Sequence, residues 1–229
     1  MNSRLIALTV SVIFLVDCAS TNPPPLPDPI AMAGLNEERG LRVNNANLLS
    51  GYILFTPLIS DTTYLINRNG QVVHTWKGEY APASTYFLKD GHLIRGGRDP
   101  NAPRFNAGGQ GGYIEKFNWE GEVVWSYELA SYQRLLHHDF EVMPNGNILA
   151  IAWENKSKTE ALAAGRRSEK TPEAGLWPDI VIEIEPQDKG GHVVWEWHSW
   201  DHMVQDTDPN LPNYGNPIDF PHKVDINTG

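Results

Sequence analysis

The chain has little cysteine, little basic charge and no long apolar run, three features that indicate the broad class of a protein. One Cys among 229 residues allows no disulfide within the chain. The 18 Lys and Arg are outnumbered by 28 Asp and Glu, whereas a nucleic-acid partner demands a basic surface. The apolar run at residues 5–16 is shorter than the roughly 20 residues that span a bilayer. We therefore expect neither a disulfide-bonded fold nor a nucleic-acid partner.

Helical hydrophobic patterns are also scarce. One Ala/Arg/Glu-rich stretch near residues 156–175 has helical character, and the rest of the chain reads as short apolar segments between turns. A parallel βαβ sheet requires a helix between successive strands. The sequence therefore favours antiparallel sheets joined by hairpins.

A short phrase occurs three times, with a glycine, a Val-Val pair and aromatic residues in the same register. Its copies are residues 70–76, 121–127 and 191–197. The first two begin about 51 residues apart and the third begins about 70 further on, the surplus being the Ala/Arg/Glu-rich insert. Each copy follows an apolar segment and a turn, which predicts a hairpin with glycine in the turn. A period near 50 is typical of a four-stranded propeller blade.

A second motif alternates with the first. Residues 87–94 match residues 142–149, and each contains an Asp-Gly or Asn-Gly pair that favours a tight turn between strands. Two hairpins per period give four strands, so the second unit is expected from about Ser84 to Tyr127 and the third from about Asp139 to Trp197. The first unit lacks its opening strand. The prediction is an all-β protein, a β-propeller with about three to four blades in this chain.

The length of the chain limits how many blades it can form. Residues 50–229 are predicted to form a partial propeller domain, because about 180 residues suffice for three blades and the start of a fourth. Closed propellers usually have four to eight blades. Residues 225–229 resemble the opening of another unit, so we expect the chain to be the N-terminal part of a longer protein.

The N-terminus is typical of an exported bacterial protein. Residues 1–18 are predicted to be a signal peptide, and Cys18 stands where a lipoprotein cysteine would be acylated. Asp17 departs from that pattern, so an ordinary signal peptide with an incidental cysteine remains the alternative. Residues 19–49 begin Pro-rich and are predicted to be a tether and lead-in. We expect a periplasmic or cell-envelope location, with membrane contact only through a lipid anchor.

The strongest candidate for chemistry is the pair His137 and His138, followed by Asp139 and a predicted strand. Residues at blade entry loops can face the central channel, where imidazole can act as an acid, a base, a nucleophile or a donor to an anion. Asp139 could fix an imidazole tautomer. The alternative is a surface loop whose histidines bond backbone carbonyls.

Other candidates give weaker signals. His198 and His202 have a spacing that would suit metal ligands on a helix, but no glutamate lies between them and their aromatic neighbours favour a packed edge. His222 stands in a Pro-rich loop and is expected at the surface. We expect no metal and no cofactor.

Three arginines lie in glycine-rich surroundings, where guanidinium groups could hold a sulfate, phosphate or carboxylate. They are Arg95, Arg98 and Arg104. The alternative is a solvated loop. No helical pattern follows the glycine run at 108–112, so it does not match a nucleotide-binding fingerprint.

Taken in order, these motifs resemble the bacterial arylsulfate sulfotransferases. The likeness runs from about residue 50 to the C-terminus. The segments that carry it are 51–55, 64–67, 70–76, 137–139, 143–149, 195–197 and 220–227.

The resemblance implies a six-bladed propeller that moves a sulfuryl group from a phenolic sulfate ester to a phenol, with small-molecule partners and no nucleotide donor. His138 matches the first channel histidine of that family, in a sulfate-binding or acid/base role, and His137 matches it less well. The family's nucleophilic histidine and its sulfate-binding arginine have no match before Gly229. We therefore expect this chain alone to be inactive. The competing hypothesis is a non-catalytic envelope propeller that binds a ligand or a protein partner.

Overall fold

The computed structural model describes residues 41, 43–45 and 49–228. The predictions for the signal peptide, Cys18 and most of the tether lie outside these residues. Within the described part, no helix is long and apolar enough to span a membrane.

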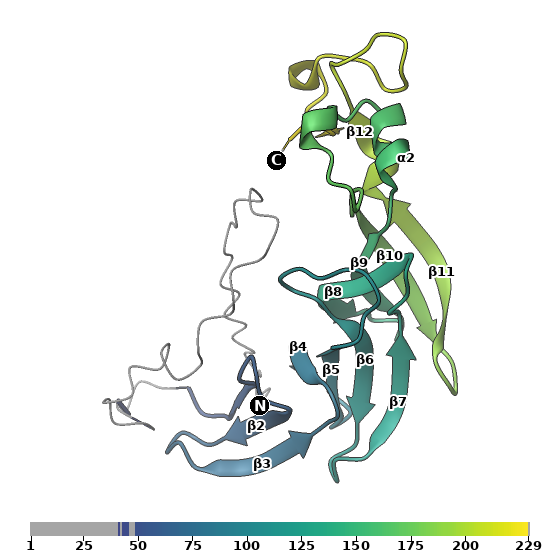
Figure 1. Ribbon diagram of the computed structural model, residues 1–229. Coiled ribbons are helices and arrows are strands. Elements are labelled where there is room, and N and C mark those ends of the chain that lie inside the picture. The colour runs from purple at the N-terminus through teal and green to yellow at the C-terminus, as the bar shows by residue number, and fades with distance from the viewer. Residues whose placement is uncertain (1–40, 42, 46–48, 229) are drawn as a thin grey trace.

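Three antiparallel sheets form the body of the molecule, and each is a blade of strands joined in sequence order (Figure 1). Among the described residues, blade 1 has three strands and blades 2 and 3 have four each, which confirms the predicted all-β, propeller-like fold. Blade 1 contains β1 (Ile53–Phe55), β2 (Thr62–Ile66) and β3 (Val72–Lys77). Blade 2 contains β4 (Ala81–Phe87), β5 (Leu93–Arg98), β6 (Gly112–Phe117) and β7 (Val123–Glu128). Blade 3 contains β8 (Arg134–Val142), β9 (Ile148–Glu154), β10 (Asp179–Pro186) and β11 (Gly191–His198).

The repeated Val-Val pair marks a β-bulge in the outer hairpin of every blade. In blade 1 the pairing passes from Leu65 with His74 to Ile66 with Val72, so Val73 has no partner in the ladder. Val124 and Val194 are skipped in the same way in blades 2 and 3. All three valines are exposed. An extra residue in one strand increases the local twist, so the repeat specifies the coiling of each blade.

The turn glycine was correctly predicted in two copies and wrongly in the third. Gly70 and Gly121 have φ of +74° and +87°, which residues with a side chain resist. In blade 3 the pairing continues as far as Pro186 with Gly191, so the left-handed residue is Gly190, at +66°. Gly191 itself begins β11.

Neighbouring blades are joined where an outer strand meets the outer turn of the next blade. The residue at the fifth position of the repeated phrase makes this contact in the first two copies. His74 Nε2 lies 2.7 Å from the carbonyl oxygen of Trp119, and Trp125 Nε1 donates to the carbonyl oxygen of Gly190 at 2.8 Å. The third copy of this position is Trp195, which is 48% exposed.

Trp125→Phe is expected to lower the free energy of unfolding by about 0.5–1.5 kcal/mol, because the Gly190 carbonyl loses its indole donor while the aromatic packing is kept. Urea denaturation measures the loss. Trp195→Phe is the matched control, with an expected change within about 0.5 kcal/mol at a half-exposed site. Equal losses in the two variants would contradict the inter-blade role of Trp125.

The Ala/Arg/Glu-rich insert is helical, as predicted. It connects β9 to β10 and contains α2 (Lys158–Ala163) and a 3₁₀ helix, η1 (Ser168–Lys170). Ser157 caps α2: its side chain accepts from the Glu160 amide, while the Glu160 carboxylate accepts from the Ser157 amide.

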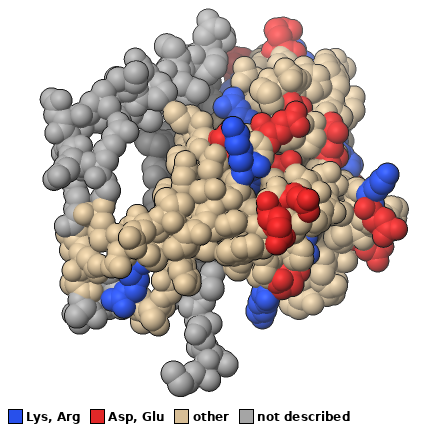
Figure 2. All heavy atoms as spheres, turned by 90° about the horizontal axis from the view of Figure 1, so that it is seen from below, with Lys and Arg blue, Asp and Glu red and all other residues tan. Residues whose placement is uncertain are grey.

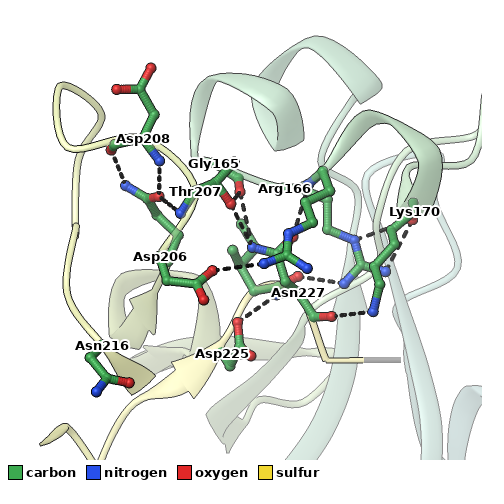
Figure 3. A network of polar contacts seen from close by, with 12 residues as sticks. Gly165, Arg166, Lys170, Asp206, Thr207, Asp208, Asn216, Asp225 and Asn227 are labelled. Carbon is green, nitrogen blue, oxygen red and sulfur yellow. Dashed lines mark hydrogen bonds and ion pairs between the residues drawn. The ribbon is translucent and has the colours of Figure 1, made fainter. Parts of the chain in front are cut away.

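The C-terminal segment packs on this insert. Short strands β12 (Met203–Val204) and β13 (Val224–Asp225) pair in parallel. The 3₁₀ helix η2 (Ser199–His202) precedes β12, and η3 (Pro217–Asp219) lies between the two strands in the chain. The buried amide of Asn227 donates to the carbonyl oxygen of Gly165 and to Thr207 Oγ1, and its oxygen accepts from the Arg167 amide (Figure 3). Arg166 donates to the carbonyl oxygens of Ile226 and Thr228. These bonds fix residues 203–228 beside blade 3.

The charge is unevenly spread. On the face drawn in Figure 2, Asp and Glu gather over one side of the molecule, and a broad neighbouring area carries few charged side chains. This agrees with the net charge of −10.

Candidate functional site

His137, His138 and Asp139 form a bulge in β8, the first strand of blade 3. Leu136 pairs with Ala152 and Phe140 with Ala150, so three residues of β8 lie opposite the single residue Ile151. The bulge holds the two imidazoles out of the regular ladder. Bulges of this kind redirect side chains and are frequent beside active sites.

A glycine-rich segment completes the backbone bonding of the bulge. The His138 amide donates to the carbonyl oxygen of Gly109 at 2.7 Å, and the Gly111 amide donates to that of Leu136 at 2.9 Å. His138 has φ of +54°, a conformation that is uncommon outside glycine. The strained backbone of His138 is therefore held by specific hydrogen bonds, as is typical of functional positions.

The first strand of blade 2 has a related bulge. Pro82 pairs with Gly97 and Thr85 with Arg95, so Ala83 and Ser84 lie opposite Gly96. The two first strands, β4 and β8, contact each other, and a small pocket of about 20 Å³ lies between the bulges. Ser84, His138 and Asp139 are among its lining residues. This volume suits one water molecule.

The two imidazoles contact each other and differ in environment. Their Nδ1 atoms are 2.8 Å apart, so one ring must donate and the other accept. His137 is 7% exposed and stacks on Trp153, with ring centroids 4.2 Å apart. Its Nε2 atom lies 3.1 Å from Asp179 Oδ1, in a close contact that is not aligned as a hydrogen bond. His138 is exposed and is the ring available to a ligand.

The environment favours a neutral His138. Although the residue is exposed, partial desolvation of the ring by its neighbours lowers the pKa of this imidazole, and the adjacent His137 lowers it further, against weaker opposite effects of Asp179 and Asp139. A lowered pKa leaves His138 uncharged at neutral pH. Because Nδ1 already contacts His137, the remaining nitrogen, Nε2, either donates a hydrogen bond or accepts a proton, according to the tautomer.

The carboxylates do not have the arrangement expected from sequence. Asp139 was expected to orient a histidine, but both of its oxygens accept from the Tyr86 hydroxyl, at 2.7 and 2.8 Å. The carboxylate that contacts a histidine is Asp179, at the start of β10. Sequence reasoning missed Asp179 because only the pairing of β10 with β9 brings it to His137.

The arginine candidates are not assembled into an anion site. Arg95 is fully buried and paired with Glu115 at 3.3 Å. Arg98 is exposed at the end of β5. Arg104 lies over the ring of Tyr132 and donates to the carbonyl oxygen of Ala174.

The remaining histidines are dispersed. His198 ends β11 between Glu154 and Glu196, with nitrogen to oxygen distances of 3.2 and 3.1 Å. His202, in η2, stacks on Trp197. His222 is exposed beside Phe220. Across residues 41, 43–45 and 49–228, no cluster of three or more His, Cys, Asp or Glu is placed to hold a metal ion.

Two comparisons with known proteins address the family of the chain. A search of curated proteins finds no match. The model of one family, described as Arylsulfotransferase (ASST), matches residues 56–224, a range that contains all three blades apart from β1 and includes the histidine bulge. This match spans well over half of the 229 residues. The chain belongs to the arylsulfotransferase family.

Proposed function

We propose that this protein takes part in the transfer of a sulfuryl group from a phenolic sulfate ester to a phenol, with His138 as a sulfate-binding or acid/base group. The observation that carries the proposal is the exposed imidazole held on the β8 bulge of an arylsulfotransferase-family chain, in surroundings that lower its pKa. Its Nδ1 atom contacts His137 Nδ1, so Nε2 is the atom left for a ligand. In one tautomer Nε2 carries the proton and donates to a sulfate oxygen, and in the other it is a base for the hydroxyl of an acceptor phenol.

His137 has a supporting role in the proposal. Its ring is buried between Trp153, Asp179 and His138, so a substrate has little access to it. The contact between the two Nδ1 atoms couples the tautomers of the two rings, because one Nδ1 must donate and the other accept. His138, rather than His137, is therefore the group that meets the sulfuryl oxygens.

The same surroundings support the proposal that these blades alone do not turn over substrate. The groups that act on His138 by charge are His137 and the carboxylates Asp179 and Asp139, and no lysine or arginine is among them. Sulfuryl transfer spreads negative charge over oxygen atoms, and its transition state is stabilised by cations and preorganised donors. We propose that the nucleophile and the cation come from residues other than the described ones.

Binding of 4-nitrophenyl sulfate to the purified chain, measured by calorimetry, tests the proposal. His138→Ala is expected to weaken binding roughly 10- to 100-fold, the effect of losing one hydrogen bond to a charged group. His222→Ala, which removes an exposed histidine outside the bulge, is the control and should bind as the unaltered chain does. Equal binding by all three proteins would contradict the role of His138 and favour a non-catalytic binding propeller.

The same mixture, with a phenol acceptor added, tests the incomplete site. We expect no release of 4-nitrophenol above the rate without protein. Release that His138→Ala abolishes would show that the described blades already hold a complete site.

A further inference from the structure

A tyrosine of blade 2 binds the histidine bulge of blade 3 by a hydrogen bond and by ring packing. Tyr86, on β4, donates its hydroxyl proton to the Asp139 carboxylate, with oxygen to oxygen distances of 2.7 and 2.8 Å. Its ring packs edge-on against Phe140, at 5.4 Å between centroids. The Phe140 amide donates to the same carboxylate at 2.9 Å. Asp139 is thus fixed by one donor from each side of the inter-blade contact.

This hydrogen bond is of the strong, charge-assisted kind. Short bonds from a hydroxyl to an ionised carboxylate are about twice as strong as neutral ones. Burial and the adjacent Asp139 raise the pKa of Tyr86 far above its usual range, so the hydroxyl keeps its proton at all physiological pH values. The donor is therefore always available to the carboxylate.

Asp139, whose carboxylate is held in this way, directly follows His138 in the chain. An anionic carboxylate close to an imidazole raises the imidazole pKa, because it favours the charged form. The groups that act on His138 are His137, Asp179 and Asp139, while the packed segment 109–111 offers it the Gly109 carbonyl. Of these, only Asp139 is held by a side chain from another blade.

We infer that Tyr86 is a positioning residue for His138: by holding Asp139 against blade 2, it prevents that carboxylate from pairing with the imidazole and keeps His138 neutral. The inference rests on the proposed function, in which a neutral His138 meets the sulfuryl group. The site then extends across two blades. The contact of blade 2 with blade 3, through Tyr86 and Asp139, influences the protonation of His138, which lies in blade 3.

The test is the pKa of His138, followed by NMR on protein with labelled histidine. Tyr86→Phe preserves the ring that packs on Phe140 and removes the hydroxyl. The pKa of His138 is expected to rise by about 1 as Asp139 turns to it. Tyr214→Phe, at an exposed tyrosine, is the control and should leave this pKa unchanged.

A second pair of variants separates positioning from packing. In Tyr86→Phe with Asp139→Asn the pKa of His138 should not rise, because the acting carboxylate is gone. An equal rise in the single and double variants would overturn the inference, as would no rise in Tyr86→Phe. Addition of 4-nitrophenyl sulfate to the unaltered chain tests the proposed function separately. If the NMR signal of His138 does not shift when the ligand is added, the proposed function is contradicted, while the pKa result for Tyr86→Phe still stands.

Discussion

Glu115→Ala is expected to lower the free energy of unfolding by about 3–5 kcal/mol, the cost of leaving one member of a buried ion pair without its partner. Arg95 has no exposed surface, and Glu115 is 5% exposed. The guanidinium lies 3.3 Å from Glu115 Oε2 and also donates to the carbonyl oxygens of Asp61 and Tyr80. Since Asp61 belongs to blade 1, the pair fixes the contact between the first two blades.

Denaturation by urea measures this loss. Glu128→Ala, at an exposed glutamate on β7 of the same sheet, is the control and should change stability by less than about 0.5 kcal/mol. Replacing the pair together, as Arg95→Met with Glu115→Leu, should recover most of the loss because no unpaired charge remains buried. A loss below about 1 kcal/mol in Glu115→Ala would contradict the account of this inter-blade contact.

Gly109→Ala is expected to displace His138 and to weaken the binding of 4-nitrophenyl sulfate roughly 10- to 100-fold, as much as removing the imidazole. A Cβ at this position would lie 2.1 Å from His138 Cε1 and 2.3 Å from Nε2. The φ of +80° adds a backbone cost of about 1–2 kcal/mol for any residue with a side chain. The ring must therefore leave its position.

The adjacent glycine supplies a matched control for this variant. A Cβ on Gly108 meets no atom within 4 Å, so Gly108→Ala should bind the aryl sulfate as the unaltered chain does. Calorimetry on the two variants makes the comparison. Normal binding by Gly109→Ala would show that the observed position of His138 is not needed for the ligand.

The repeated phrases predicted the blades because hairpin turns and strand alternation are local properties. The apolar segment that precedes the second copy of the phrase, residues 112–117, is β6. The bulge at Val73 and its two counterparts was not predicted, because the pattern of apolar residues does not show which valine drops out of the ladder. The third turn was placed one residue late for a similar reason, since only the register of β10 with β11 shows where pairing ends.

The sequence indicated the histidines of the candidate site but not their partners. His137 and His138 stood out by residue type, but their partners depend on contacts between distant segments. Asp179 reaches His137 through the pairing of β10 with β9. Asp139 was matched to the wrong partner because proximity in sequence was taken for proximity in space, whereas the bulge directs its carboxylate to Tyr86.

The central claim is that His138 is a neutral imidazole that meets the sulfuryl group, and the most direct measurement is an NMR titration of that one residue. We predict that His138 titrates below about 6.5, the usual value for histidine, and that its signals shift when 4-nitrophenyl sulfate is added. A pKa above 6.5, or signals that the aryl sulfate leaves unchanged, would contradict the account.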